Sequence, residues 1–325
     1  MSSSWQEFEQ LSRTIIREWG FQVGNSAQNR YQKDIDINGK HILLKRAIKR
    51  GVEPKYIEFV GECKSWNDKI DIDIVDQLVG YRENFELDNI PTITAIFSKN
   101  GFTDRAQNRA KMQDILMVDW KELYDLASYS IIHQGPGIIS RTSFPFYSNI
   151  NCLYAILEVI NLKEFAGEWS ANDLWQDLEQ NQLWFNNSGE PYAKSIINDH
   201  LNVLTLLGIL NWDTNTKNPM KFRENKFIEV LLRSNLWKKE IFEIMQFNAV
   251  KIPWIRELLF AFNLHPNKNN KTIFSILENT QPGFDIESLK FSLKLSRDLN
   301  LIDKNNQLNN EISKFLWHKM ELVKK

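Results

Sequence analysis

One apolar stretch decides how the first part of this chain folds, and it reads Tyr56-Ile57-Glu58-Phe59-Val60-Gly61-Glu62-Cys63-Lys64. Its β-branched and aromatic residues predict a buried β-strand. Residues two apart in a strand point to the same face, so Glu62 and Lys64 share one face and Cys63 points to the other. A carboxylate can hold a divalent cation, and a lysine beside it can orient or help to deprotonate a water molecule. The stretch therefore supplies half of a site for phosphodiester cleavage.

The spacing Glu-x-Lys occurs three times in the chain, and by itself it carries little information. The other two copies are Glu53-Pro54-Lys55 and Glu224-Asn225-Lys226. Proline argues against a central strand at the first copy, and the second has polar, loop-like neighbours. Only the copy that ends an apolar β-rich run lies where a site can be built.

Bulk properties predict a cytoplasmic protein with two or three domains. The length is 325 residues, and no apolar run approaches the roughly 20 residues that span a bilayer. The N-terminus lacks the basic and apolar regions of a signal peptide. Two cysteines, Cys63 and Cys152, provide neither a disulfide framework nor a zinc site. We therefore expect no membrane partner.

The net charge of −1 does not by itself indicate a nucleic-acid partner. A specific enzyme can nevertheless carry its positive charge locally. Two local clusters are basic: Lys45, Arg46, Lys49, Arg50 and Lys55 form one, and Lys217, Lys221, Arg223 and Lys226 form the other. For each cluster a solvated surface explains the charge as well as a nucleic-acid contact does.

The pattern of residues 1–133 predicts an α/β domain with a mixed central sheet flanked by helices. The spacing of apolar residues favours helices over residues 5–19, 72–85, 103–112 and 120–127, and strands over residues 21–23, 90–97 and 115–119. Asn38-Gly39 is typical of a tight hairpin, so we expect an acidic strand over residues 34–37 to return as residues 41–44.

Residues 134–149 are rich in helix and strand breakers and are predicted to be a linker. The chain beyond them has a helical pattern, and residues 150–226 resemble a winged helix-turn-helix. Its recognition helix would be Tyr192–Leu207 and its wing Asn211–Phe222. Residues 227–325 are predicted to form a second helical, winged-helix-like domain, because the step Leu207-Gly-Ile-Leu returns there in weaker form as Leu299-Asn-Leu-Ile. A duplication is one explanation of this echo.

A nuclease needs more than one acid, and Asp36 lies in the segment before the Glu62 strand. Neighbouring strands would bring the two carboxylates together. Mg²⁺ prefers octahedral oxygen ligation and usually takes one or two protein carboxylates. Such a cation would activate water and stabilise charge on the scissile phosphate, and Lys64 would position or deprotonate that water.

Residues 5–127 resemble the PD-(D/E)XK nuclease superfamily, and within it the Mrr-type restriction endonucleases. Six motifs carry the resemblance in order along the chain: Phe8-Glu9 with Gly20-Phe21-Gln22-Val23, Ile35-Asp36, Glu62-Cys63-Lys64, Gln77-Leu78-Val79-Gly80-Tyr81, the segment Phe97–Ala106, and Val118-Asp119-Trp120. Each motif is weak alone, whereas the ordered set is specific.

The resemblance implies roles for five side chains. Asp36 and Glu62 would bind Mg²⁺, with Mn²⁺ able to substitute, and Lys64 would activate water. Glu9 would line the site from the first helix, and Gln77 would assist at the active site. For Asp36 the alternative is a polar hairpin residue, with Asp34 as the substitute ligand; for Glu9 and Gln77 it is a solvated helix position, and for Glu62 with Lys64 a salt bridge.

Two features depart from the family pattern. Many members carry Gly-Asp-x-Gly before the aspartate, whereas this chain has Tyr31-Gln-Lys-Asp34. The usual order also has a winged helix before the nuclease, whereas here the candidates follow it. Cleavage chemistry is compatible with both departures, but substrate preference does not carry over.

The sequence thus predicts a Mg²⁺-dependent DNA endonuclease of the restriction or defence type, acting on double-stranded DNA. DNA contacts are expected from Lys194, Asn198, Asn202, Lys217, Lys221 and Arg223. One active site per chain indicates a homodimer or sequential nicking; a strict monomer that makes concerted double-strand breaks would contradict the dimer. The alternatives are a DNA-binding regulator on an inactive nuclease fold, and a nuclease for repair or structured DNA.

Overall fold

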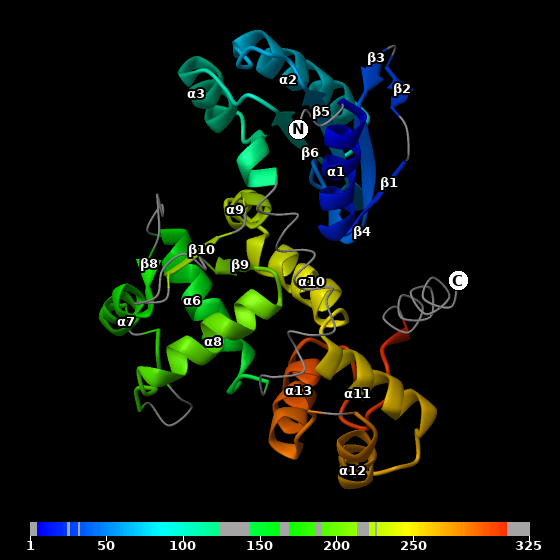
Figure 1. Cartoon of the computed structure of the whole chain (residues 1–325), viewed down its shortest axis with the longest axis vertical. Helices are drawn as coiled ribbons and strands as arrows, with labels where there is room; N and C mark the ends of the chain where they lie inside the picture. Colours follow the sequence, from blue (N-terminus) through cyan, green and yellow to red (C-terminus); the bar gives the residue numbers. More distant parts are fainter. Residues whose placement is uncertain are drawn as a thin grey trace. The chain divides into compact units, whose positions relative to one another are not determined.

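The computed structural model describes residues 5–24, 27–31, 33–123, 144–162, 169–181, 183–185, 190–212, 221–224, 226–281 and 283–310, with only the backbone of residues 33, 169–171, 211, 212, 221–224 and 226. The chain divides into two compact units, Met1–Gly135 and Pro136–Lys325 (Figure 1). None of the described helices is long and apolar enough to cross a membrane.

The first unit is built on a five-stranded sheet with the order β1-β4-β5-β6-β7. Its strands are β1 (Phe21–Val23), β4 (Ile37–Arg46), β5 (Lys55–Lys64), β6 (Thr92–Ser98) and β7 (Leu116–Asp119). β1, β4 and β5 pair antiparallel, whereas β5, β6 and β7 pair parallel. The predicted mixed sheet is therefore confirmed. A separate antiparallel pair joins β2 (Gln28–Arg30) to β3 (Lys33–Ile35).

Helices cover both faces of this sheet (Figure 1). They are α1 (Trp5–Glu18), α2 (Ile72–Leu87) and α3 (Asp104–Met112). On one face Val60 and Ile96 share a buried core with Leu78 of α2 and Ala106 of α3. On the other face Phe59 meets Trp19, the residue after α1, with ring centroids 6.4 Å apart. Successive side chains of β5 therefore point alternately to the face of the sheet covered by α2 and to the face covered by α1.

Apart from the hairpin expected over residues 34–44, and from β2, which was not predicted, the helices and strands of this unit are borne out with small shifts in their ends. Thr103 caps α3, because its side-chain oxygen accepts a hydrogen bond from the Ala106 N–H at 3.2 Å. Of the helix predicted over residues 120–127, residues 120–123 are helical and the remainder lies outside the described residues. The predicted linker is likewise outside them up to residue 143, and residues 144–149 have no regular structure.

The hairpin expected at Asn38-Gly39 is wrong. Both residues lie inside β4, paired with Val60 and Phe59 of β5, so the chain does not turn there. Gly39 is required for another reason: a Cβ at this position would lie 2.7 Å from a methyl carbon of Val23 on β1. The interior of β4 therefore needs glycine where β1 approaches closely, and the Asn-Gly pair gave a misleading turn signal.

The second unit begins with α6 (Ile150–Leu162), β8 (Trp169–Ser170), α7 (Ala171–Gln180), α8 (Ser195–Leu206), β9 (Leu210–Trp212) and β10 (Lys221–Glu224). The three strands form an antiparallel sheet with the order β8-β10-β9. Residues 213–220 of the predicted wing lie outside the described part of the chain. Up to residue 310, where the described part of the chain ends, five helices follow: α9 (Lys226–Leu232), α10 (Trp237–Ala249), α11 (Pro253–Leu264), α12 (Asn270–Thr280) and α13 (Ile286–Asp298).

The sequence echo within this unit corresponds to the same helix ending used twice. After α8, Gly208 has a φ of +67°, and after α13, Asn300 has a φ of +52°. In both cases the next N–H turns back to a carbonyl of the helix, from Ile209 to Leu204 and from Leu301 to Ser296, each at 2.9 Å. These are left-handed C-terminal caps. A strand follows the first cap, and an Ile302–Leu308 bridge follows the second.

Candidate active site

Glu62 and Lys64 lie at the carboxyl end of β5, next to the parallel strand β6. Val60 packs under α2, so the alternation of the strand brings Glu62 and Lys64 out on that same face. Glu62 is 2% exposed. The Lys64 Nζ donates a hydrogen bond to Glu62 Oε2 at 2.7 Å. Residues at the carboxyl ends of adjacent parallel strands lie where open α/β sheets usually bind ligands.

Strand register brings Asp36 to the same place. Ile37 of β4 pairs with Gly61 of β5, so the residue before Ile37 lies beside the end of β5. Asp36 Oδ2 accepts a hydrogen bond from the Cys63 N–H at 2.8 Å and lies 3.9 Å from Lys64 Nζ. Three side chains predicted from two separate stretches of sequence therefore form one cluster.

Burial and charge act against one another in this cluster. Burial, with the neighbouring Asp36 charge, raises the pKa of Glu62 to about 7, against the lowering effect of the hydrogen bond from Lys64. Burial by itself would lower the pKa of Lys64, but the hydrogen bond and charge of Glu62, together with Asp36, leave that pKa raised. The Lys64 ammonium thus offsets part of the charge of the two carboxylates.

The donors of this cluster suit a hard divalent cation. Asp36 and Glu62 offer carboxylate oxygens, and Glu62 Oε1 is buried with no hydrogen-bond partner among the described residues. A buried oxygen without a partner is costly unless a cation or water satisfies it. The described residues contain no group of three or more histidine, cysteine or acidic side chains placed to hold a metal. Two carboxylates are nevertheless the usual protein contribution to a Mg²⁺ site.

Asp34, the alternative ligand, lies elsewhere. It is exposed on β3, and its Oδ1 accepts a hydrogen bond from the Asn29 side chain of β2 at 3.1 Å. The side chain thus belongs to the small two-stranded pair. Among the described residues, Asp36 is the aspartate that joins Glu62 and Lys64.

Glu9 reaches the cluster only indirectly. It is buried on α1 and pairs with Arg13 one turn later, whose Nε donates to Glu9 Oε1 at 3.1 Å. Arg13 also donates to the backbone carbonyl of Asp36, and to that of Gly24 at 2.8 Å. Glu9 therefore holds Arg13, and Arg13 anchors the backbone of Asp36.

Gln77 lies on α2 with an exposed side chain. Its amide donates a hydrogen bond to the Tyr81 hydroxyl one turn further along the helix. Among the described contacts this bond stays within α2, and none joins Gln77 to Glu62 or Lys64. An assisting role for Gln77 stays a prediction.

Two residues of this region were not singled out from the sequence. Arg13 is 1% exposed, and its only sequence signal is a charge four residues after Glu9, a pattern common on solvated helices. Trp66 is 50% exposed, and its ring lies 5.7 Å from Lys64 Nζ. A half-exposed tryptophan beside a cluster of charged groups is available to contact a ligand. In the sequence, the feature that could have identified Trp66 is its position two residues after Lys64.

The residues expected to contact DNA lie in the second unit. Lys194 precedes α8, and Asn198 and Asn202 follow at intervals of four residues, which places the three on one helix face. Lys194 is exposed, whereas Asn202 Oδ1 is buried and lacks a hydrogen-bond partner among the described residues. Lys221 and Arg223 lie on β10, of which only the backbone is described, and Lys217 lies outside the described residues.

Comparisons with known proteins identify one family model and two similar solved structures. The family model Mrr_cat, described as restriction endonuclease, matches residues 1–127. A similar solved structure is the MspJI restriction endonuclease in complex with a 27-mer oligonucleotide, at 15% identity and a TM-score of 0.28; the match covers 40% of this chain and 29% of that chain. Another is the protein of unknown function AF1548, at 14% identity and a TM-score of 0.29, covering 62% of this chain and 98% of that chain. A search of curated proteins found no match.

Proposed function

Since residues 1–127 form an Mrr-type restriction endonuclease domain, we propose that this chain is a Mg²⁺-dependent DNA endonuclease of a restriction or related defence system. The observation that carries the proposal is the meeting of Asp36, Glu62 and Lys64 at the carboxyl end of β5. An inactive fold used only for binding has no need to keep these three charged groups together. Their meeting therefore favours catalysis over a purely regulatory role.

The roles of the side chains follow from their positions. Asp36 and Glu62 would hold the cation, which when bound supplies Lewis-acid stabilisation of the charge on the scissile phosphate and activates water. Lys64 Nζ, 2.7 Å from Glu62 Oε2, can hydrogen-bond a water molecule or a phosphate oxygen at the same place. The β5 backbone holds Asp36 through the Cys63 N–H. Hydrolysis by the mechanism of this superfamily leaves 5′-phosphate and 3′-hydroxyl ends.

Cleavage of plasmid DNA tests this proposal. We expect the purified chain to cut a supercoiled plasmid in the presence of Mg²⁺ or Mn²⁺, and to leave it intact when EDTA removes the cation. Discrete fragments would support restriction, and smearing or a preference for junctions would support the alternative of a repair nuclease. An intact plasmid under all metal conditions would contradict the nuclease and favour the DNA-binding regulator. The order in which nicked and linear forms appear separates sequential nicking from concerted cleavage by a dimer.

For DNA recognition we propose a winged helix formed by residues 150–226, with α8 as the recognition helix. The order of α6, β8, α7, α8, β9 and β10 and the antiparallel β8-β10-β9 sheet support this assignment. Lys194 would contact a phosphate, Asn198 would face base edges, Asn202 would contribute its amide nitrogen because its Oδ1 is buried, and Lys217, Lys221 and Arg223 would lie on or beside the wing. Phosphate contacts determine register, and base contacts determine sequence preference.

Separate substitutions on α8 test this division of roles. Lys194→Ala should weaken binding to all duplexes alike and lower the salt dependence of binding by about one phosphate contact. Asn198→Ala should instead reduce discrimination between preferred and unrelated sequences by about 1–3 kcal/mol. Asn181→Ala, on the loop after α7, is the matched control. If Lys194→Ala, Asn198→Ala and Asn181→Ala all kept the sequence preference of the wild type, α8 would not be the recognition helix.

A further inference from the structure

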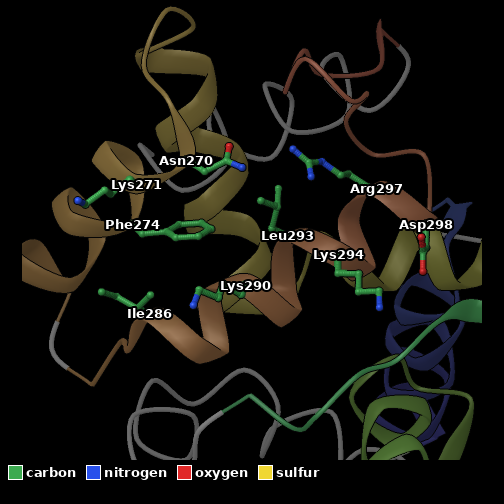
Figure 2. Close-up of a pocket in the computed structure, with 9 residues that line it drawn as sticks. All are labelled: Asn270, Lys271, Phe274, Ile286, Lys290, Leu293, Lys294, Arg297 and Asp298. Atoms are coloured by element: carbon green, nitrogen blue, oxygen red, sulfur yellow. The ribbon is translucent and has the colours of Figure 1, made fainter.

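A cavity of about 730 Å³ lies between α12 and α13 (Figure 2). Its lining residues are Asn270, Lys271 and Phe274 of α12, and Ile286, Lys290, Leu293, Lys294, Arg297 and Asp298 of α13. Phe274 and Leu293 point toward one another across the floor. The cavity thus has an apolar floor and a charged rim, and it is called here the α12–α13 groove.

The rim of the groove is strongly basic. Four of its side chains are cationic, Lys271, Lys290, Lys294 and Arg297, and one is acidic, Asp298. The Asp298 carboxylate already accepts a hydrogen bond from the Tyr147 hydroxyl at 2.8 Å. Within the described part of the chain, the three lysines form no ion pair, and all three are exposed. Clustered positive charge above an apolar floor attracts an anionic ligand.

Arg297 is held in place at one end of the groove. It donates a hydrogen bond to Asn306 Oδ1 at 2.8 Å, and Asn306 donates in turn to Asn270 Oδ1 at 2.8 Å. This relay joins α13 to α12 through the turn after Leu301. Arg297 Nε is buried and has no hydrogen-bond partner among the described residues. The Asn306 bond therefore holds the guanidinium at this end of the groove, and its remaining N–H groups include the unpaired Nε–H.

In the sequence echo, α13 corresponds to α8. The shared cap aligns Leu207 with Leu299, and the same offset aligns Asn198 with Lys290 and Asn202 with Lys294. α13 is thus related to the helix proposed to read DNA. Where α8 has amides suited to base edges, α13 has ammonium groups suited to phosphates.

We propose that the α12–α13 groove binds the phosphate backbone of duplex DNA, as a second contact site beside α8. This inference rests on the proposed DNA-cleaving function. Lys290 and Lys294 are one helical turn apart, about 6 Å along the axis. Their long stems can reach successive phosphates of one strand. The site adds affinity and holds the duplex without reading its sequence, which suits a chain whose overall charge is close to neutral.

Binding of a fluorescent duplex in EDTA, followed by anisotropy over a series of salt concentrations, tests the groove. The variant Lys290→Ala/Lys294→Ala should bind at least about tenfold more weakly at low salt. The slope of log K against log salt should fall by about two, since each lost phosphate contact contributes about 0.9. Lys239→Ala on α10, whose side chain is 57% exposed, is the control and should retain the wild-type slope.

The outcomes separate this inference from the proposed function. If the double variant keeps the wild-type affinity and slope while the wild-type chain cuts plasmid, the groove proposal alone is overturned. If the wild-type chain does not cut but the double variant loses slope, the groove proposal stands and the nuclease proposal fails. Binding of a mononucleotide to the wild type and to the double variant is measured in the same buffer. If the double variant lost mononucleotide binding while its duplex binding stayed unchanged, the groove would be a small-molecule site and the proposal would be overturned.

Discussion

Substitution of Lys64 by alanine is expected to lower the rate of plasmid cleavage by about 10²–10⁴-fold while leaving duplex affinity close to wild type. Lys64 is the one cation within reach of both carboxylates among the described residues, 2.7 Å from Glu62 and 3.9 Å from Asp36. DNA affinity depends on phosphate contacts spread over a larger surface, so one lysine contributes a small share of it.

Two measurements make this result specific. Lys111→Ala, an exposed lysine in the last turn of α3, should cleave at the wild-type rate. Circular dichroism and thermal unfolding should show that the Lys64 variant keeps its fold. Glu62 loses a buried partner in this variant, but its carboxylate can take up a proton, which removes the buried charge. Cleavage by Lys64→Ala at the wild-type rate would mean that the site has been assigned to the wrong residues.

Substitution of Arg13 by methionine is expected to destabilise the first unit by about 3–5 kcal/mol. The change leaves Glu9 as an uncompensated buried carboxylate and removes the Arg13 hydrogen bonds to the backbone carbonyls of Asp36 and Gly24, of which Gly24 keeps a bond from Arg17 at 3.3 Å. Cleavage should also fall, because the Asp36 backbone loses its anchor while the Asp36 side chain is unchanged. Urea unfolding at neutral pH measures the first effect, and plasmid cleavage well below the unfolding transition measures the second.

A surface pair provides the control for this experiment. Arg105 is 74% exposed and 4.0 Å from Asp71, so Arg105→Met should change the free energy of unfolding by less than about 1 kcal/mol. The double variant Glu9→Leu/Arg13→Met should recover part of the loss, because it removes the buried charge together with its partner. If Arg13→Met matched Arg105→Met in stability, the buried pair would contribute nothing.

The order of elements in the first unit could be predicted because its signals are local. The helix capped by Thr103 and the buried strand ending at Lys64 depend on the alternation, capping and composition of neighbouring residues. The turn at Asn38-Gly39 was predicted wrongly from equally local information. There the space available beside Val23 of β1 determined the need for glycine, and that space exists only after β1 and β4 have paired.

In the candidate site, too, some features follow from local sequence and others depend on long-range packing. The shared face of Glu62 and Lys64 follows from the two-residue period of a strand, so sequence alone predicts their pairing. Whether Asp34 or Asp36 joins them depends on the register of Ile37 against Gly61, which no local signal determines. The partner of Glu9 was likewise hidden, because an i,i+4 pair is usually solvated and only the packing of α1 buries this one.

By itself, the sequence determined an α/β first unit with a mixed sheet, its resemblance to Mrr-type endonucleases, and the Glu62–Lys64 pair. These depend on the order of residues along the chain. Only the tertiary structure decided that Asp36 approaches Cys63, that Arg13 supports it, and that Lys290 and Lys294 share a basic groove with α12. Each of these contacts joins residues from separate elements. Their distances depend on strand register and helix packing, which long-range burial of apolar surface determines.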